Sequence, residues 1–169
     1  MQLRDLHAEL GIPEDYAKSG ARPRYEDASD LVEVGPNIVG RMQRLEPGTA
    51  AAWAAMQQAA AADGVTLLLV SGFRSRDYQA RLIRKKINAG QSLGDILTVS
   101  AAPGFSEHHT GRAIDIATPG SRPLTEEFEE TAAFRWLVEH APGHGFSMSY
   151  PPGNAAGFAY EPWHWARKA

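Results

Sequence analysis

Three short segments of the sequence carry residue types that could bind a metal ion and cleave a bond. The first, residues 106–115, reads SEHHTGRAID and contains two potential metal ligands, His108 and Asp115. If this segment ends in a strand, alternation places Asp115 on the same face as the small Ala113, which favours an open site over a packed core. Taken alone, Asp115 could equally belong to an ordinary hydrogen-bond network at a strand end.

The second segment, residues 161–165, reads EPWHW and brings a carboxylate close to a histidine. A zinc peptidase needs three protein ligands, one open position for water, and a carboxylate that accepts the proton of that water. His108, Asp115 and His164 could be the ligands. Glu161 could then be the base. The alternative is that the two tryptophans are core residues and His164 is a hydrogen-bonded histidine beside them.

The third segment, residues 71–75, reads SGFRS and lies between an apolar run and a helical pattern. The permanently charged guanidinium of Arg74 could bind a peptide carboxylate or a developing oxyanion there. An arginine at such a turn could also form a simple surface ion pair. Because the chain has no cysteine, any metal site must be built from His, Asp and Glu.

The segments that carry these motifs must be positioned by helices and strands. Alanine-rich residues 49–63 predict a helix that ends before Gly64, with Trp53, Met56 and Ala60 on one buried face.

Further elements follow in mixed order along the chain. Residues 65–71 predict a buried strand, and Ser75 is a suitable cap for a helix that ends before Gly90. The remaining patterns predict a helical turn near 93–97, a strand at 112–117, a helix from the cap Thr125 to about His140, and a final strand at 158–165. Helices and strands mixed through short antiparallel-type connections favour an α+β fold.

The length and composition are those of a single globular domain. We expect residues 1–169 to form one domain, with residues 1–46 as a mostly irregular N-terminal wrap and residues 65–165 carrying the motifs. The net charge of −3 provides no basic face for nucleic acid. Apolar runs such as Val65 to Val70 are too short to cross a membrane. The N-terminal residues lack the apolar core of a signal peptide, so the chain as written carries no export address.

Taken together, the three segments resemble the VanY-type zinc D-alanyl-D-alanine carboxypeptidases, whose metal-site architecture is shared with lysostaphin-like peptidases. The family pattern is Ser-x-His-x-x-Gly-x-Ala-x-Asp, then Glu-x-Trp-His, preceded by Ser-Gly-Tyr-Arg-Ser with a downstream Gln. This chain matches the pattern at Ser71, Gly72, Arg74, Ser75, Gln79, Ser106, His108, Gly111, Ala113, Asp115, Glu161, Trp163 and His164. Phe73 replaces the common tyrosine, and Ala166 precedes an arginine that is displaced by one position.

The resemblance implies a small, mostly antiparallel sheet flanked by helices, as in the hedgehog-like peptidase fold. It also implies that Zn²⁺ is held by His108, Asp115 and His164. Glu161 would be the general base and then the proton donor to the leaving amine, and Arg74 would stabilise the oxyanion. Ser106 and Gln79 would contact the substrate, a peptidoglycan stem peptide or precursor. Such a substrate would place the protein in the periplasm, whereas the sequence as written indicates the cytoplasm; the compartment and the oligomeric state stay open.

Several other functions use a similar set of residues. An LD-carboxypeptidase or a cell-wall endopeptidase would share the same site chemistry and differ in the shape of the loops. A non-catalytic zinc-binding relative of the fold would have no need of the base Glu161. An Fe(II) oxygenase also uses two His and one carboxylate, but it favours a His-x-Asp spacing on a jelly roll.

The spacing of Glu161 and His164 predicts a local break in the last strand. In a regular strand two residues three apart point to opposite faces, whereas the proposed chemistry needs both near one metal. Proline is found at strand starts, edges and bulges. We therefore expect the chain to bend near Pro162, or the regular strand to begin only after Glu161.

Overall fold

The computed structural model describes residues 1–18 and 21–169 and confirms an α+β fold. A four-stranded antiparallel sheet, in the order β3-β4-β6-β5, occupies the centre, and a separate hairpin, β1-β2, precedes it. The strands are β1 (Val32–Pro36), β2 (Met42–Leu45), β3 (Leu68–Ser71), β4 (Ala113–Ala117), β5 (Phe146–Met148) and β6 (His164–Arg167). The main helices are α1 (Leu3–Leu10), α2 (Pro47–Ala62), α3 (Arg76–Asn88), α4 (Leu93–Val99) and α5 (Ala132–His140).

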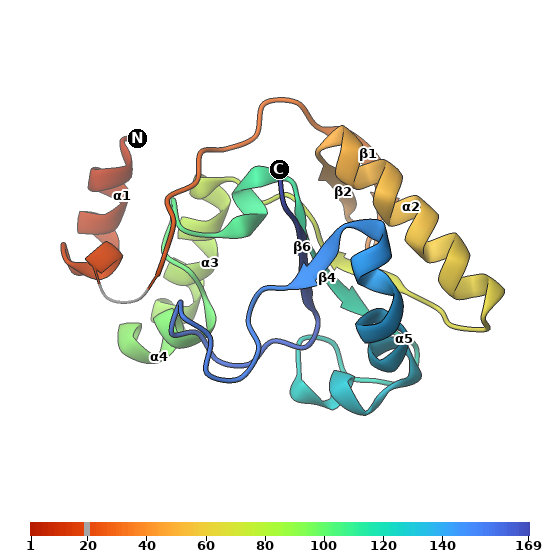
Figure 1. Cartoon of the computed structure of the whole chain (residues 1–169). Coiled ribbons are helices and arrows are strands. Elements are labelled where there is room, and N and C mark those ends of the chain that lie inside the picture. The colour runs from red at the N-terminus through yellow and green to blue at the C-terminus, as the bar shows by residue number, and fades with distance from the viewer. Residues whose placement is uncertain (19–20) are drawn as a thin grey trace.

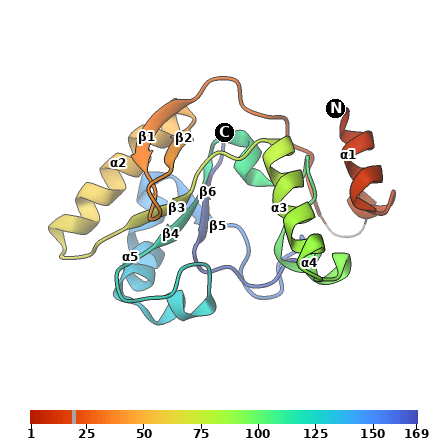
Figure 2. The ribbon, with the colours of Figure 1, turned by 180° about the vertical axis from the view of Figure 1, so that it is seen from behind.

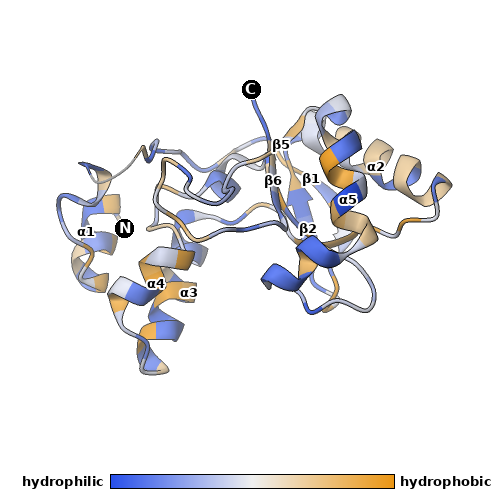
Figure 3. Cartoon of the chain, turned by 60° about the horizontal axis from the view of Figure 1, so that its bottom comes forward, coloured by the Kyte–Doolittle hydropathy of each residue, from blue (hydrophilic) through white to orange (hydrophobic). Residues whose placement is uncertain are grey.

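Helices lie on either side of the sheet (Figure 1). Helices α2 and α5 lie on one side, and α1, α3 and α4 lie on the other, as the view from behind also shows (Figure 2). Two hydrophobic clusters correspond to these sides: one joins α2 and α5 to the sheet, and the other joins α1, α3 and α4. The apolar faces of α3 and α4 lie together, and α2 is weakly apolar along most of its length because it is rich in alanine (Figure 3).

Local sequence signals explain the elements that flank the site. The hydroxyl of Ser75 accepts a hydrogen bond from the backbone N–H of Tyr78 and caps α3, as predicted. Strand β4 is buried at all five positions. Helix α2 begins at Pro47 rather than Thr49, because the Glu46 side chain caps the first turn and proline suits its first position.

Two elements differ from the sequence prediction. The expected helix from Thr125 to His140 is divided: Glu126–Glu130 form a 3-10 turn, and α5 begins after Thr131. Thr131 is in an extended conformation, and its hydroxyl accepts from the N–H of Phe134, so it is Thr131 rather than Thr125 that caps the helix.

The other difference concerns the ends of the chain. The expected strand at 158–165 is regular only from His164, because a turn at Pro162 precedes it. This is the break that the spacing of the motif predicted. Residues 1–46 contain α1 and the β1-β2 hairpin and are thus more regular than expected. Among the described residues, no helix is long and apolar enough to cross a membrane.

Candidate metal centre

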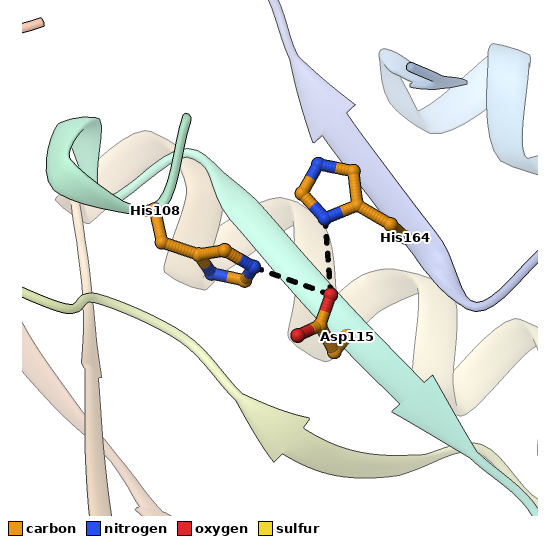
Figure 4. Close-up of side chains that lie close together, drawn as sticks. All are labelled: His108, Asp115 and His164. Atoms are coloured by element: carbon orange, nitrogen blue, oxygen red, sulfur yellow. Dashed lines mark hydrogen bonds and ion pairs between the residues drawn. The ribbon is translucent and has the colours of Figure 1, made fainter. Parts of the chain in front are cut away.

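The three predicted ligands meet at the centre of the sheet (Figure 4). Asp115 on β4 and His164 on β6 are direct cross-strand partners, so sheet pairing itself brings them together. His108 comes from the 3-10 turn Glu107–Thr110 that leads into β4. The turn ends at Gly111, whose φ of 69° lies in the left-handed region that favours glycine.

Their donor atoms converge on one point. Asp115 Oδ1 lies 3.2 Å from His108 Nε2 and 3.0 Å from His164 Nδ1. One donor atom from each residue lies within 4.8 Å of the others, and the three residues are only 2–4% exposed. Two imidazole nitrogens and one carboxylate oxygen are a donor set that suits zinc. The arrangement therefore fits a metal ion of this kind.

Hydrogen bonds on the far side of each ring set which nitrogen is available. His108 Nδ1 lies 2.7 Å from the carbonyl oxygen of Gly72. A carbonyl can only accept, so Nδ1 carries the proton and Nε2 presents its lone pair to the centre. Burial, helped by the positive charge of Arg74, lowers the pKa of His108 to about 4, which keeps this ring neutral.

Glu107 is a site residue that sequence analysis missed. Its Oε2 atom lies 2.9 Å from His164 Nε2 and accepts a hydrogen bond of 2.6 Å from the hydroxyl of Ser149. Burial opposes the charged form of Glu107, but the bonds from His164 and Ser149 hold its pKa below the ordinary value. Its place between Ser106 and His108 in the motif was the available signal, and the sequence alone did not show that its side chain reaches β6.

Two neighbouring carboxylates determine the pKa of His164. Burial by itself lowers the pKa of His164, but its hydrogen bonds to Asp115 and Glu107 outweigh burial and raise the pKa to about 10. Burial likewise opposes ionisation of Asp115, yet the charge of His164 and its hydrogen bond help to hold the pKa of Asp115 well below the ordinary value. A metal ion that binds through His164 Nδ1 must displace the proton on that nitrogen, while Nε2–H continues to donate to Glu107.

Glu161 lies beside the ligands and not in the regular strand. The N–H of His164 donates to the Glu161 carbonyl over 3.2 Å, which closes a turn with Pro162 at its second position. This turn brings Glu161 Oε2 to 3.8 Å from His164 Nδ1. The Glu161 side chain is 13% exposed, and burial raises its pKa to about 7 despite the opposing charge of His164.

Arg74 is held in place by the protein and is not a free surface charge. Its Nη1 atom donates to Ser71 Oγ over 3.0 Å and lies 3.5 Å from Asp115 Oδ2. Its Nε donates to Gln79 Oε1 over 3.2 Å. The buried His109 donates through Nδ1 to the Arg74 carbonyl over 2.6 Å, so this histidine turns away from the metal and anchors the arginine backbone.

All seven residues predicted from the sequence line one cavity of about 430 Å³, which also contains Tyr150 and Lys86. The seven are Arg74, Gln79, Ser106, His108, Asp115, Glu161 and His164. The ring of Tyr150 packs on that of His164 with centroids 4.8 Å apart. A larger cavity of about 600 Å³ contains Glu107 but none of the three candidate ligands, so the smaller cavity is the candidate site.

Replacing Glu107 is expected to weaken metal binding. Outer carboxylates that orient a histidine ligand typically contribute about 10–100-fold to metal affinity. We expect Glu107→Ala to lower zinc affinity by about this factor, and Glu107→Gln to lower it less because the amide oxygen can still accept from His164. Competition with a chromophoric chelator measures this, with Glu139→Ala as control because that side chain is 77% exposed. Unchanged affinity in Glu107→Ala would contradict the orienting role.

Comparison with known proteins identifies relatives that share this arrangement of elements. The family model of VanY, D-alanyl-D-alanine carboxypeptidase, matches residues 42–167. A D-alanyl-D-alanine carboxypeptidase of Enterococcus faecalis is 33% identical over 117 residues, which cover 63% of this chain and 42% of that protein. This chain spans about half the length of the curated relatives it matches.

Two solved structures extend the comparison. The structure of the LdcB LD-carboxypeptidase has 32% identity and a TM-score of 0.74, covering 86% of this chain and 71% of that one. The second structure is the D,D-pentapeptidase VanY of a VanB-type resistance cassette, a glutamate-to-alanine mutant in complex with Zn(II). It has 26% identity and a TM-score of 0.66, covering 90% of this chain and 88% of that one. The range that the family model matches contains the candidate ligands, Glu161 and Arg74. The chain therefore belongs to the VanY D-alanyl-D-alanine carboxypeptidase family.

Proposed function

We propose that this chain is a zinc-dependent carboxypeptidase that removes the terminal D-alanine of peptidoglycan-type peptides. The observation that carries the proposal is the convergence of three metal ligands, a buried carboxylate and a fixed guanidinium in one cavity. His108, Asp115 and His164 would hold the zinc ion. When bound, zinc supplies a Lewis acid and lowers the pKa of water at its open position.

In this proposal Glu161 moves the proton. Its carboxylate takes a proton from the attacking water, whose oxygen bonds to the scissile carbonyl carbon. The same carboxyl then gives the proton to the amine nitrogen as the C–N bond breaks, so the carboxylate is regenerated. A carboxyl whose pKa burial has raised to about 7 is suited to both steps, although a nearby cation lowers that pKa.

Three further residues would act on the peptide. Arg74 would stabilise the negative charge that develops on the carbonyl oxygen. Ser106 would donate through its hydroxyl proton, because its oxygen already accepts from the N–H of His108. Gln79 accepts from Arg74 and donates to the Ala101 carbonyl over 2.8 Å. Its remaining amide hydrogen is therefore the group proposed to contact substrate.

LD-carboxypeptidase activity is the main alternative. The two similar structures differ on this point, since LdcB is named an LD-carboxypeptidase and VanY a D,D-pentapeptidase. Cell-wall endopeptidase activity would use the same residues. A non-catalytic zinc site is disfavoured by Glu161, whose buried carboxylate lies within 3.8 Å of a ligand. The sheet flanked by helices also differs from the jelly roll expected of an Fe(II) oxygenase.

Metal analysis combined with a peptide panel tests the proposal. We expect one zinc per chain, and release of D-alanine from a stem pentapeptide ending in D-Ala-D-Ala, detected by mass spectrometry. Chelation should abolish release and added zinc should restore it. His164→Ala should lose zinc, whereas His140→Ala, at an exposed position, should retain it. Preferential cleavage of a tetrapeptide with an L-D terminal bond would favour the alternative, and a protein purified with iron would contradict the proposed metal.

A further inference from the structure

Lys86 is a second cation in the catalytic cavity, and neither the metal centre nor the proposed chemistry uses it. It lies in the last turn of α3 and is half-buried. Its ammonium donates to the hydroxyl of Ser100 over 2.8 Å and lines the same cavity as Arg74 and Glu161. Among residues 1–18 and 21–169, no carboxylate lies within salt-bridge distance of it.

The position of Lys86 is not explained by helix stability alone. A cation in the last turn of a helix interacts favourably with the helix dipole, but the adjacent Lys85 can do this while it remains exposed. Burial lowers the pKa of Lys86, and the charge of Arg74 adds to this effect while Glu161 opposes it. The ammonium is therefore partly removed from water, and its hydrogen-bond partner is a neutral hydroxyl. Burial of the charge costs free energy, and a bound anion would offset that cost.

The two cations of the cavity have different partners. Two nitrogens of Arg74 are engaged with Ser71, Asp115 and Gln79, which direct this guanidinium to the metal centre. Lys86 lies two turns after Gln79 on the same face of α3. Gln79 donates to the carbonyl of Ala101, and Lys86 donates to the adjacent Ser100. The ammonium therefore lies on the part of the cavity wall that Gln79 and residues 100–101 also form.

We infer that Lys86 binds the terminal carboxylate of the peptide and thereby selects substrates that end one residue beyond the scissile bond. This inference rests on the proposed carboxypeptidase function. A carboxypeptidase must recognise an anionic chain end that an endopeptidase substrate lacks, since there the same position holds a neutral amide. The ammonium of Lys86 supplies the opposite charge, and Arg74 stays available for the scissile carbonyl oxygen.

Binding of D-alanyl-D-alanine and of its C-terminal amide tests this inference separately from turnover. The affinities are measured by calorimetry on zinc-loaded protein that carries Glu161→Gln, with the Lys86 and Lys85 substitutions added to it. A charge-assisted hydrogen bond corresponds to about 10–100-fold in affinity. We expect Glu161→Gln alone to prefer the free acid by about this factor. Lys86→Met should remove most of the preference, Lys86→Arg should keep part of it, and Lys85→Met should leave it unchanged.

Each other result overturns the assignment. If Lys86→Met retains the preference for the free acid, another group holds the carboxylate. If the parent protein binds acid and amide equally, or fails to bind the acid, no such carboxylate site exists. Thermal unfolding of each variant verifies that it is folded, and methionine keeps the apolar stem of lysine. Failure of the proposed function is distinguishable, because the wild type would then release no D-alanine while the acid preference of the binding site persisted.

Discussion

Glu161→Gln is expected to abolish peptide hydrolysis while zinc remains bound. Glutamine has almost the same shape, but it cannot accept the proton of water or return it to the leaving amine. The loss of a general acid-base group typically slows a reaction by about 100–10,000-fold. Because Glu161 lies 3.8 Å from the nearest ligand nitrogen and the three ligands remain, the variant should keep one zinc per chain.

Single-turnover kinetics and metal analysis on the same preparation decide the role of Glu161. Glu139→Gln is the matched control, since it makes the same chemical change at an exposed position. If zinc and activity are lost in equal proportion, Glu161 is a ligand and not the base. If zinc is retained and kcat is unaffected, a different residue moves the proton.

The same variant has an expected signature in the metal-free protein. Burial raises the pKa of Glu161 from its ordinary value of 4.5 to about 7. Between these values the folded chain holds a proton that the unfolded chain has released, so the free energy of unfolding falls as pH rises through this window. Glutamine does not ionise and therefore does not lose this free energy as the pH rises. Denaturant unfolding of the metal-free protein above about pH 7 should therefore find Glu161→Gln more stable, by up to about 3 kcal/mol, with little difference below about pH 4.5.

Several features of the candidate metal centre could be predicted from the sequence because they follow from local rules. Alternation along β4 places Asp115 on the face that lines the cavity, and Gly111 permits the turn that brings His108 back to it. The spacing of Glu161 and His164 is incompatible with a continuous strand, so the bend near Pro162 followed from the requirement that both residues face one metal. These features depend on neighbours that are close in sequence, whereas the meeting of Asp115 and His164 depends on the pairing of β4 with β6.

The features that were missed depend on contacts between distant segments. Glu107 contacts His164, 57 positions away, and its role depends on strand pairing that periodicity does not specify. Lys86 reads as a basic residue at the end of a helix, and only the path of residues 100–101 makes it part of the cavity. The division of the helix at Thr131 also escaped prediction, because Thr125 and Thr131 are chemically identical capping candidates and tertiary packing selects between them.

Arg74→Ala is expected to reduce kcat and kcat/KM by about 100–1,000-fold, which corresponds to about 2.7–4 kcal/mol of transition-state stabilisation. The physical reason is preorganisation. Ser71 and Gln79 hold the guanidinium from two directions, and the hydrogen bond from His109 fixes its backbone. A donor held in this way stabilises the developing oxyanion without moving at the moment of reaction.

The kinetic pattern separates this role from the alternatives. Arg74→Lys keeps the charge but loses the planar guanidinium that donates to both Ser71 and Gln79, so it should recover only part of the rate. Arg81→Ala, at an exposed position of α3, should have little effect. Because Arg74 also lies 3.5 Å from the ligand Asp115, zinc content must be measured for each variant. With zinc retained, an increase in KM alone would assign Arg74 to ground-state binding of the peptide, and an unchanged kcat/KM would mean that its contacts serve only the fold.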